Sequence, residues 1–320
     1  MEYLELETEF ANFIGVSGCV SVSTGTGALH VALEALQLPE GSEVIVPQYT
    51  MIATAWAVHY ARLVPVFVDC DDSLLINIEE IEKKITDKTR VIMVTHVYGR
   101  VVNMDAVKDL AKKYGLRIIE DAAEAHGCKW NDKIVGATDI GCFSFYRNKI
   151  ICGEEGGAVV SNDSEFLDIV RDMKSMSFGK KHNYMHDRMG FNYRMTNSQA
   201  AMILESLANI KENTKKRRDN QELYDSLIDK EHHMSSRDIP WVYDICVEDN
   251  TIVDKLIAMG IPARYGFKPV SMCHPFRVDA SDTKCYTMSK KVMYLPVDPE
   301  LSEERIHWIA KKLSEVKNEN

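Results

Sequence analysis

Two polar side chains in one stretch of the sequence have the types and spacing that amine chemistry needs. Lys149 follows an apolar run at 140–146 that is typical of a buried strand, and Ser144 stands five residues before it. A lysine at the exit of a buried strand is poorly solvated, so its pKa falls and its amine becomes a nucleophile. A lysine in an exposed hairpin turn, the ordinary interpretation, has neither property. The residues that accompany Lys149 therefore decide whether it is a buried nucleophile or an exposed turn residue.

Two other features also stand where predicted strands end. Asp121 closes the apolar run 116–121, and the small-residue turn 24–28 follows the run 19–23 and precedes a predicted helix. Free N–H groups and the positive end of a helix dipole make such a turn an anion-binding site. The turn lacks the Gly-Lys-Ser/Thr of a P-loop, and His30 stands where a dinucleotide fingerprint needs glycine. A tight connection without a ligand is the alternative interpretation.

Short apolar strands and amphipathic helices alternate along the first half of the chain. We expect strands at 19–23, 43–47, 65–69, 90–95, 116–121, 140–146 and 158–161, and helices at 2–13, 29–36, 51–61, 78–85, 104–114 and from 163 to about 176. This alternation predicts an α/β fold with a mainly parallel sheet and helices on both faces. Ligands of such sheets bind beyond the carboxyl ends of the strands, where Asp121, Lys149 and the turn 24–28 all lie.

A long helical stretch at 196–227 separates this part from a C-terminal segment with a different pattern. That segment offers strands at 241–247 and after Gly260, and helices at 252–259, 283–291 and 302–316. The pattern predicts a smaller α+β domain. We therefore divide the chain into a large domain, 1–228, and a small domain, 229–320.

Composition excludes several classes of protein. With 320 residues, 45% of them hydrophobic, the chain has ample core for one large or two modest domains. A formal net charge of −10 argues against a nucleic-acid partner, and no apolar run reaches the roughly 18 residues of a membrane span. The acidic start at Met1 is no signal peptide, and the eight cysteines contain no Cys-x-x-Cys pair. We expect reduced structural thiols in a cytoplasmic enzyme without a metal site, zinc ligation being a poor alternative.

An activated lysine, a carboxylate, an anion-binding turn and a serine are together the groups that hold pyridoxal phosphate. The lysine would bond to the cofactor, Asp121 would pair with its protonated ring nitrogen, and the turn and Ser144 would bind its phosphate. Taken singly, each residue has an ordinary interpretation: Asp121 could cap a helix, and Glu124 could be a solvated helix residue. Together and in this order, these residues indicate a pyridoxal phosphate site more specifically than any one of them does.

Several motifs of the chain occur in the same order in one enzyme family. Among them are Ser23-Thr-Gly-Thr-Gly-Ala-Leu-His30, Glu120-Asp-Ala-Ala-Glu-Ala-His-Gly127, Phe143-Ser-Phe-Tyr-Arg-Asn-Lys149, Glu155-Gly-Gly157 and Asn192-Tyr-Arg-Met-Thr-Asn-Ser-Gln-Ala-Ala201. Through these motifs, which are collinear over nearly the whole chain, the sequence resembles the DegT/DnrJ/EryC1/StrS sugar aminotransferases, which have the fold-type-I architecture of pyridoxal phosphate enzymes. His186-Asp187 followed by 192–197 most resembles the perosamine-forming members. Those enzymes aminate C4 of a nucleotide-linked 4-keto-6-deoxysugar for O-antigen and other polysaccharides.

The resemblance implies a role for each candidate residue around the cofactor. Lys149 would bond to the cofactor and carry the proton between cofactor and sugar, Asp121 would pair with the pyridine nitrogen, and Glu124 would lie near the 3-hydroxyl. The phosphate would be bound by Gly25, Thr26, Gly27 and Ser144. Met51 stands where relatives place an aromatic residue against the cofactor ring, and a thioether packs on a ring with different geometry.

The resemblance also implies two substrates and a second subunit. Glutamate would donate the amino group to a nucleotide-linked ketosugar. Asn192 would reach the phosphate of the neighbouring subunit's cofactor, so that a homodimer would share its active sites. His186 and Arg194 are candidates for sugar contact, against the ordinary interpretations of a solvated histidine and a structural anchor.

Alternative functions remain, both among sugar aminotransferases and outside them. The alternative aminotransferases are a UDP- or dTDP-linked 4-ketosugar aminotransferase of viosamine type and a 3-ketosugar aminotransferase. Glu154 replaces a glycine of the turn after Lys149, where it would strain the turn or add a negative charge near the site. Met1 falls after a leading segment that shapes the sugar site in relatives, so that either the sugar pocket is built differently or the chain is a shortened version. These departures also motivate a non-catalytic regulatory paralogue that binds pyridoxal phosphate. Lys149 argues against a family dehydratase, which has histidine there, and the missing fingerprint argues against a nicotinamide oxidoreductase.

Overall fold

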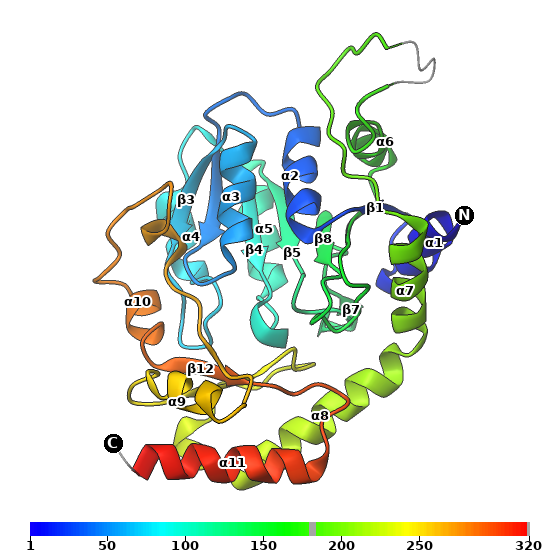
Figure 1. Cartoon of the computed structure of the whole chain (residues 1–320). Coiled ribbons are helices and arrows are strands. Elements are labelled where there is room, and N and C mark those ends of the chain that lie inside the picture. The colour runs from blue at the N-terminus through cyan, green and yellow to red at the C-terminus, as the bar shows by residue number, and fades with distance from the viewer. Residues whose placement is uncertain (179–183, 319–320) are drawn as a thin grey trace.

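The computed structural model describes residues 1–178 and 184–318. A seven-stranded sheet in the order β1-β9-β8-β5-β4-β2-β3 lies at its centre (Figure 1). Strands β8, β5, β4, β2 and β3 are mutually parallel, whereas β9 runs antiparallel to β8 and β1. The strands are β1 (Gly18–Val22), β2 (Glu43–Pro47), β3 (Val64–Val68), β4 (Thr89–Thr95), β5 (Arg117–Asp121), β8 (Ile140–Ser144) and β9 (Gly157–Ser161). The predicted α/β fold with a mainly parallel sheet is confirmed.

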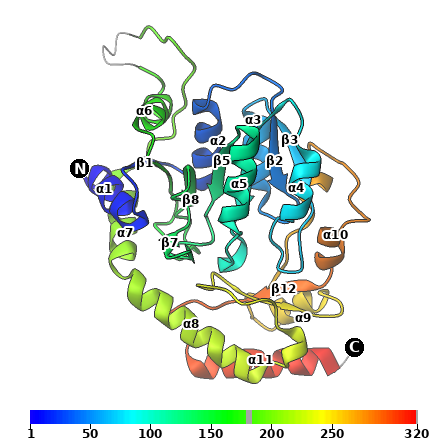
Figure 2. The ribbon, with the colours of Figure 1, turned by 180° about the vertical axis from the view of Figure 1, so that it is seen from behind.

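Helices cover both faces of this sheet, as the two opposite views in Figure 1 and Figure 2 show. They are α1 (Glu2–Ile14), α2 (Gly25–Ala35), α3 (Ile52–Tyr60), α4 (Ile78–Lys84), α5 (Met104–Tyr114) and α6 (Ser164–Met173). Successive side chains of a strand point to opposite faces, so each strand contributes to two cores. In β4, Val91 and Met93 pack in the core with α2, α3 and α6, whereas Ile92 and Val94 pack with α1, α4 and α5.

The anion-binding turn predicted at 24–28 is itself the first turn of α2. Thr24 is the N-cap residue, and its Oγ1 accepts a hydrogen bond from the Gly27 N–H at 3.0 Å. The cap lets the helix begin four residues earlier than the apolar pattern suggests, because a capped first turn needs no apolar face of its own. The glycines therefore stand at the positive end of the helix.

The helical stretch predicted at 196–227 is two helices, α7 (Asn197–Ala208) and α8 (Ile210–Leu227). Thr196 starts α7 with a capping box in which its hydroxyl and the Gln199 side chain each accept the other residue's N–H. Asn209 interrupts the pair with φ −92° and ψ 5°. This break lets α8 turn away and run beside the C-terminal helix α11 (Glu303–Asn318) (Figure 1).

A second, antiparallel sheet in the order β10-β12-β11 faces the carboxyl ends of the first sheet. Its strands are β10 (Tyr243–Cys246), β11 (Arg264–Tyr265) and β12 (Val292–Leu295), with helices α9 (Ile252–Ala258) and α10 (Lys284–Met288). Tyr224, Leu256 and Ile309 belong to a separate core behind this sheet. The domain boundary between 228 and 229 directly follows α8 and stays a prediction. The short strands β6 (Lys129–Trp130) and β7 (Lys133–Ile134) form a separate hairpin.

A buried ion cluster fastens the second sheet to the first. Asp244 in β10 forms an ion pair at 2.9 Å with Arg100, which follows β4, and a second at 2.6 Å with Arg237. Burial alone would raise the pKa of Asp244, but the two guanidinium groups hold it below its ordinary value. The carboxylate is therefore charged, and removing it would leave two buried cations without their partner.

None of the helices within 1–178 and 184–318 is both long and apolar enough to cross a membrane. All eight cysteines are free thiols, and five of them are buried. Burial raises the pKa of the Cys19, Cys128 and Cys142 thiols, so these side chains stay protonated and pack as small apolar groups.

Candidate active site

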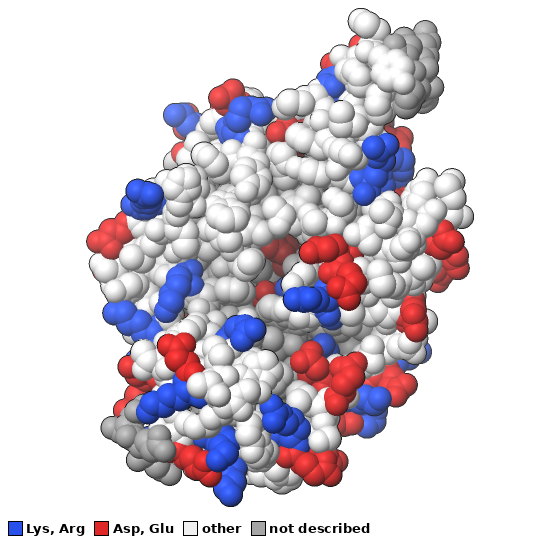
Figure 3. All heavy atoms as spheres, in the orientation of Figure 1, with Lys and Arg blue, Asp and Glu red and all other residues white. Residues whose placement is uncertain are grey.

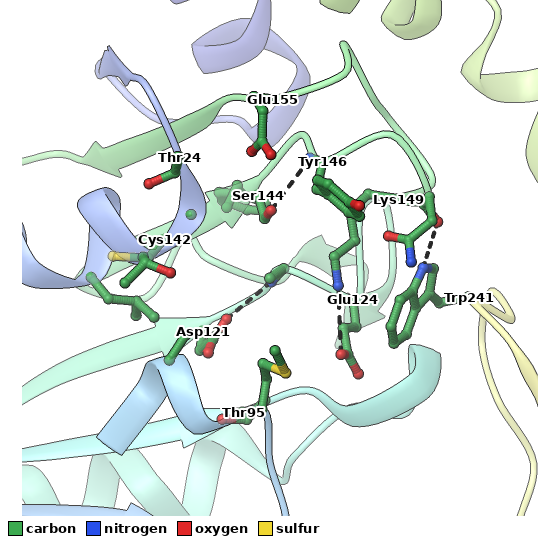
Figure 4. Close-up of a pocket in the computed structure, with 18 of the residues that line it drawn as sticks. Thr24, Thr95, Asp121, Glu124, Cys142, Ser144, Tyr146, Lys149, Glu155 and Trp241 are labelled. Atoms are coloured by element: carbon green, nitrogen blue, oxygen red, sulfur yellow. Dashed lines mark hydrogen bonds and ion pairs between the residues drawn. The ribbon is translucent and has the colours of Figure 1, made fainter. Parts of the chain in front are cut away.

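A pocket of about 500 Å³ opens at the carboxyl ends of β4, β5 and β8, where the two sheets face each other (Figure 4). This volume lies within the range of about 300 to 1,000 Å³ that is usual for small-ligand sites. Acidic side chains gather beside a hollow in the middle of this face of the molecule (Figure 3). Among the described residues, the charged groups on the pocket wall are three carboxylates and one amine, namely Asp121, Glu124, Glu155 and Lys149.

Lys149 lies in the turn that follows β8 and points into the pocket (Figure 4). Strand β8 ends at Ser144 rather than at residue 146, because the N–H of Lys149 bonds the carbonyl of Tyr146 at 2.8 Å and closes a turn. The side chain is 11% exposed, and its Nζ is 3.5 Å from Oε1 of Glu124. Burial lowers the pKa of Lys149, although the nearby carboxylates oppose the shift. The predicted buried amine is thus present.

Glu124 is the acidic partner of this amine. Its Oε2 accepts a hydrogen bond from the backbone N–H of Tyr98 at 3.1 Å, and its carboxyl group is buried. Burial raises the pKa of Glu124 to about 7, against the lowering influence of Lys149 and the Tyr98 N–H. A carboxyl group that titrates near neutrality beside a lysine can exchange a proton with it, which is the property a general acid–base pair needs.

Asp121 lies deeper in the pocket at the end of β5. Its carboxylate accepts a hydrogen bond from Thr54 Oγ1 at 2.7 Å and one from the Ala123 N–H at 3.2 Å. Burial raises the pKa of Asp121, although both hydrogen bonds oppose the rise. A cation placed against this carboxylate would lower its pKa again and would offset the cost of burying it. A protonated ring nitrogen is such a cation.

The start of α2 and Ser144 form an anion cradle on the opposite side of the pocket. The first N–H groups of a helix have no partner within it, and those of Gly25 and Thr26 stand at the pocket wall. A Cβ on Gly25 would lie 2.6 Å from the Cβ of Ser144, so only glycine lets the helix start approach this close. The cradle, the Lys149 amine and the Asp121 carboxylate match the phosphate, the aldehyde and the ring nitrogen of pyridoxal phosphate. The residues present therefore fit this cofactor.

Several residues predicted from the sequence lie off the pocket wall of this chain. Gly27 stands behind the cradle, where its N–H is used by Thr24. Asn192 pairs with the guanidinium of Arg194 at 2.9 Å, and His186 Nδ1 is 3.0 Å from the carbonyl oxygen of Ser177. Asn192, Arg194 and His186 belong to the segment between α6 and α7, part of which reaches away from the sheet in Figure 1. Their roles stay predictions.

Two residues that depart from the family pattern have clear positions. Met51 does line the pocket mouth, where its side chain is 53% exposed. Glu154 is exposed in the turn after Lys149 and has a φ of 62°. This left-handed conformation favours glycine, so the backbone is strained at Glu154.

The structure also adds pocket residues that the sequence did not point to. They include Thr95, Tyr146, Glu155, Trp241, Phe267 and Tyr294. Glu155 belongs to the Glu-Gly-Gly motif, which was a usable signal. The side chain of Trp241 comes from the second sheet region, and no local pattern connects it with Lys149.

Nearly the whole sequence matches one family of enzymes. Residues 1–314 match the DegT/DnrJ/EryC1/StrS aminotransferase family. The GDP-perosamine synthase of Escherichia coli O157:H7 is 36% identical over 97% of this chain and 89% of its own, and that of Vibrio cholerae is 40% identical over 69% of this chain and 60% of its own. The crystal structure of S. venezuelae DesV superposes with a TM-score of 0.91 at 28% identity, covering 98% of this chain and 89% of DesV. The chain therefore belongs to the DegT/DnrJ/EryC1/StrS aminotransferase family, with pyridoxal phosphate as its cofactor.

Proposed function

We propose that this enzyme transfers an amino group from glutamate to C4 of a nucleotide-linked 4-keto-6-deoxysugar, as a GDP-perosamine synthase does. The observation that carries the proposal is the Lys149 amine held 3.5 Å from Glu124, opposite the Gly25 cradle, in one pocket. The similarity to GDP-perosamine synthases over most of the chain supports the C4 position and the GDP-linked sugar.

The polar groups of the pocket would have separate roles in the reaction. Pyridoxal phosphate, when bound, supplies an electron sink for the amino transfer. Asp121 would keep the ring nitrogen protonated, and the Gly25 cradle with Ser144 would hold the phosphate end. Lys149 would bond the cofactor and would also move the substrate proton. Glu124 exchanges a proton with Lys149, so that the amine can act both as base and as acid near neutral pH.

We further propose that the active unit is a homodimer. Glutamate and a nucleotide diphosphate sugar are anions, yet among the described residues Lys149 is the one cation on the pocket wall, and it is the reactive group. His186, Asn192 and Arg194 would supply binding groups from the second copy. The segment that carries them also exposes the large apolar side chain of Met189 (56% exposed), which a second copy would cover. The free thiols fit a reducing compartment such as the cytoplasm.

A substrate panel tests the proposal. The purified enzyme with pyridoxal phosphate and glutamate would be offered GDP-, UDP- and dTDP-linked 4-keto-6-deoxysugars and a 3-keto analogue, with product masses as the readout. We expect the amine product from the GDP-linked 4-ketosugar and none with Lys149→Ala. Preference for a UDP- or dTDP-linked sugar, or for the 3-keto position, would replace the proposed substrate. A bound cofactor whose visible absorbance glutamate leaves unchanged would favour the regulatory alternative.

A further inference from the structure

Trp241 contacts the reactive lysine segment in two ways, through its ring face and through its indole N–H. It lies two residues before β10 and is 6% exposed. Its indole Nε1 donates a hydrogen bond to the carbonyl oxygen of Asn148 at 2.6 Å, directly beside the lysine in the chain. The Nζ of Lys149 lies 3.7 Å from the centroid of the indole ring. Figure 4 shows the ring beside Lys149 and Glu124.

The position of this ring is set by elements outside the turn that carries Lys149. The carbonyl oxygen of Trp241 accepts a hydrogen bond from Arg217 Nη1 at 2.9 Å, and the ring packs against Tyr98 and Tyr294 with centroids 6.0 and 6.2 Å away. The following strand β10 is fastened by the buried carboxylate of Asp244. Lys149 itself comes from the turn after β8 in the first sheet. The indole therefore joins the reactive amine to a separate part of the fold.

The other titratable groups around Lys149 leave the indole a measurable effect on the protonation of the amine. Glu124 and Asp121 face the amine as carboxylates from the end of β5. His126 stays neutral because burial lowers its pKa to about 3, and burial raises the pKa of Tyr294 to about 12. The pKa of Tyr98 is likewise raised well above its ordinary value by burial, so both phenols stay neutral. A cation within about 6 Å of an indole face is attracted by the ring, most strongly where water is excluded.

We propose that Trp241 is a positioning residue for Lys149: its ring face holds the ammonium form in the pocket before the cofactor bonds, and its hydrogen bond to Asn148 holds the adjoining backbone. The hydrogen bond keeps the backbone beside the lysine in place. The ring face stabilises the ammonium form whenever the lysine is not bonded to the cofactor. The proposal rests on the assignment of Lys149 as the lysine that bonds pyridoxal phosphate.

Cofactor capture by the apoenzyme tests this role without measuring turnover. The neutral nitrogen of Lys149 attacks the aldehyde carbon of added pyridoxal phosphate, one water leaves, and borohydride then reduces the new C=N bond to a stable C–N bond. The modified fraction of the Lys149 peptide would be measured by mass across a pH series. The variants are Trp241→Leu, which loses the aromatic ring and the hydrogen bond, and Trp241→Phe, which keeps a smaller aromatic face and loses the hydrogen bond.

The two variants should separate the two contacts. Because the indole favours the ammonium form, Trp241→Leu should move the capture midpoint to lower pH by about one unit. Trp241→Phe keeps an aromatic face, so its midpoint should stay within about 0.3 unit of the wild type, while its capture should be several-fold slower. Trp130→Leu is the matched control, because this half-buried tryptophan also donates from Nε1, to Asp105 at 3.0 Å, outside the pocket. It should match the wild type in midpoint and rate.

The possible results distinguish the role of the Trp241 ring, the proposal as a whole and the cofactor assignment. An unchanged or raised midpoint in a Trp241→Leu protein with a cooperative melting transition would overturn the role of the ring. If that variant does not fold, Trp241→Phe decides alone, and a wild-type capture rate would overturn the proposal. Failure of the wild type to modify Lys149 at any pH would refute the cofactor assignment itself and with it this role.

Discussion

Replacing Glu124 by glutamine should make the protein more stable, although the residue belongs to the reaction. The side chain is buried, and burial raises its pKa from 4.5 to about 7. An acid whose pKa is higher in the folded state than in the unfolded chain binds its proton more tightly when folded. Stability therefore falls as the pH rises from 4.5 towards 7, where the folded carboxyl group loses its proton. Glutamine has no proton to lose and can still accept the Tyr98 N–H.

The size of the effect follows from the pKa difference of about 2.5 units, each worth about 1.4 kcal/mol. The stability advantage of Glu124→Gln over the wild type should therefore grow by about 3 kcal/mol between pH 4.5 and pH 8. Urea unfolding of the apoenzyme at a series of pH values measures this. Product formation by the same variant should fall, because Lys149 loses the group with which it exchanges a proton.

Glu120→Gln is the matched control, since this acid is also fully buried and lies four residues earlier in the chain. Its Oε2 is 3.0 Å from His96 Nε2, and although burial alone would raise its pKa, His96 and two backbone N–H groups lower it below the ordinary value. An acid with a lowered pKa stabilises the fold above its unfolded pKa, so Glu120→Gln should destabilise at neutral pH by about 3 kcal/mol. Wild-type and Glu124→Gln stabilities that run parallel from pH 4.5 to 8 would refute the reasoning.

Three further substitutions test other parts of the structure. Gly25→Ala places a methyl group 2.6 Å from the Cβ of Ser144, so the affinity for pyridoxal phosphate, measured by absorbance titration, should fall at least about tenfold with unchanged circular dichroism. An unaltered affinity would show that the cradle does not bind the phosphate. Glu154→Gly relieves a left-handed φ of 62° and should raise stability by about 0.5 to 1 kcal/mol in urea unfolding, whereas a loss of stability would contradict the strain. Asp244→Ala leaves Arg100 and Arg237 as unpaired buried cations and should cost about 3 to 5 kcal/mol; a loss below about 1 kcal/mol would mean that the cluster does not hold the sheets together.

Local sequence was sufficient for the parts of the site that are close together in the chain. The apolar run that became β8 places Ser144 and Lys149 at one strand exit, and the Thr24 cap with its glycines marks the start of α2. Strand periodicity predicted the parallel sheet because continuous apolar runs must be buried on both faces. These signals depend only on neighbours in sequence, so they can be interpreted without knowing the fold.

Only the packing of distant segments decided what surrounds the amine. Thr54 of α3 contacts Asp121, the Tyr98 N–H in the turn after β4 contacts Glu124, and Trp241 in the segment before β10 contacts Lys149. Periodicity shows which face of an element is buried but not which segment covers it, because that depends on the strand order and on how the two sheets face each other. The raised pKa of Glu124 has the same origin, since burial is a property of the assembled pocket.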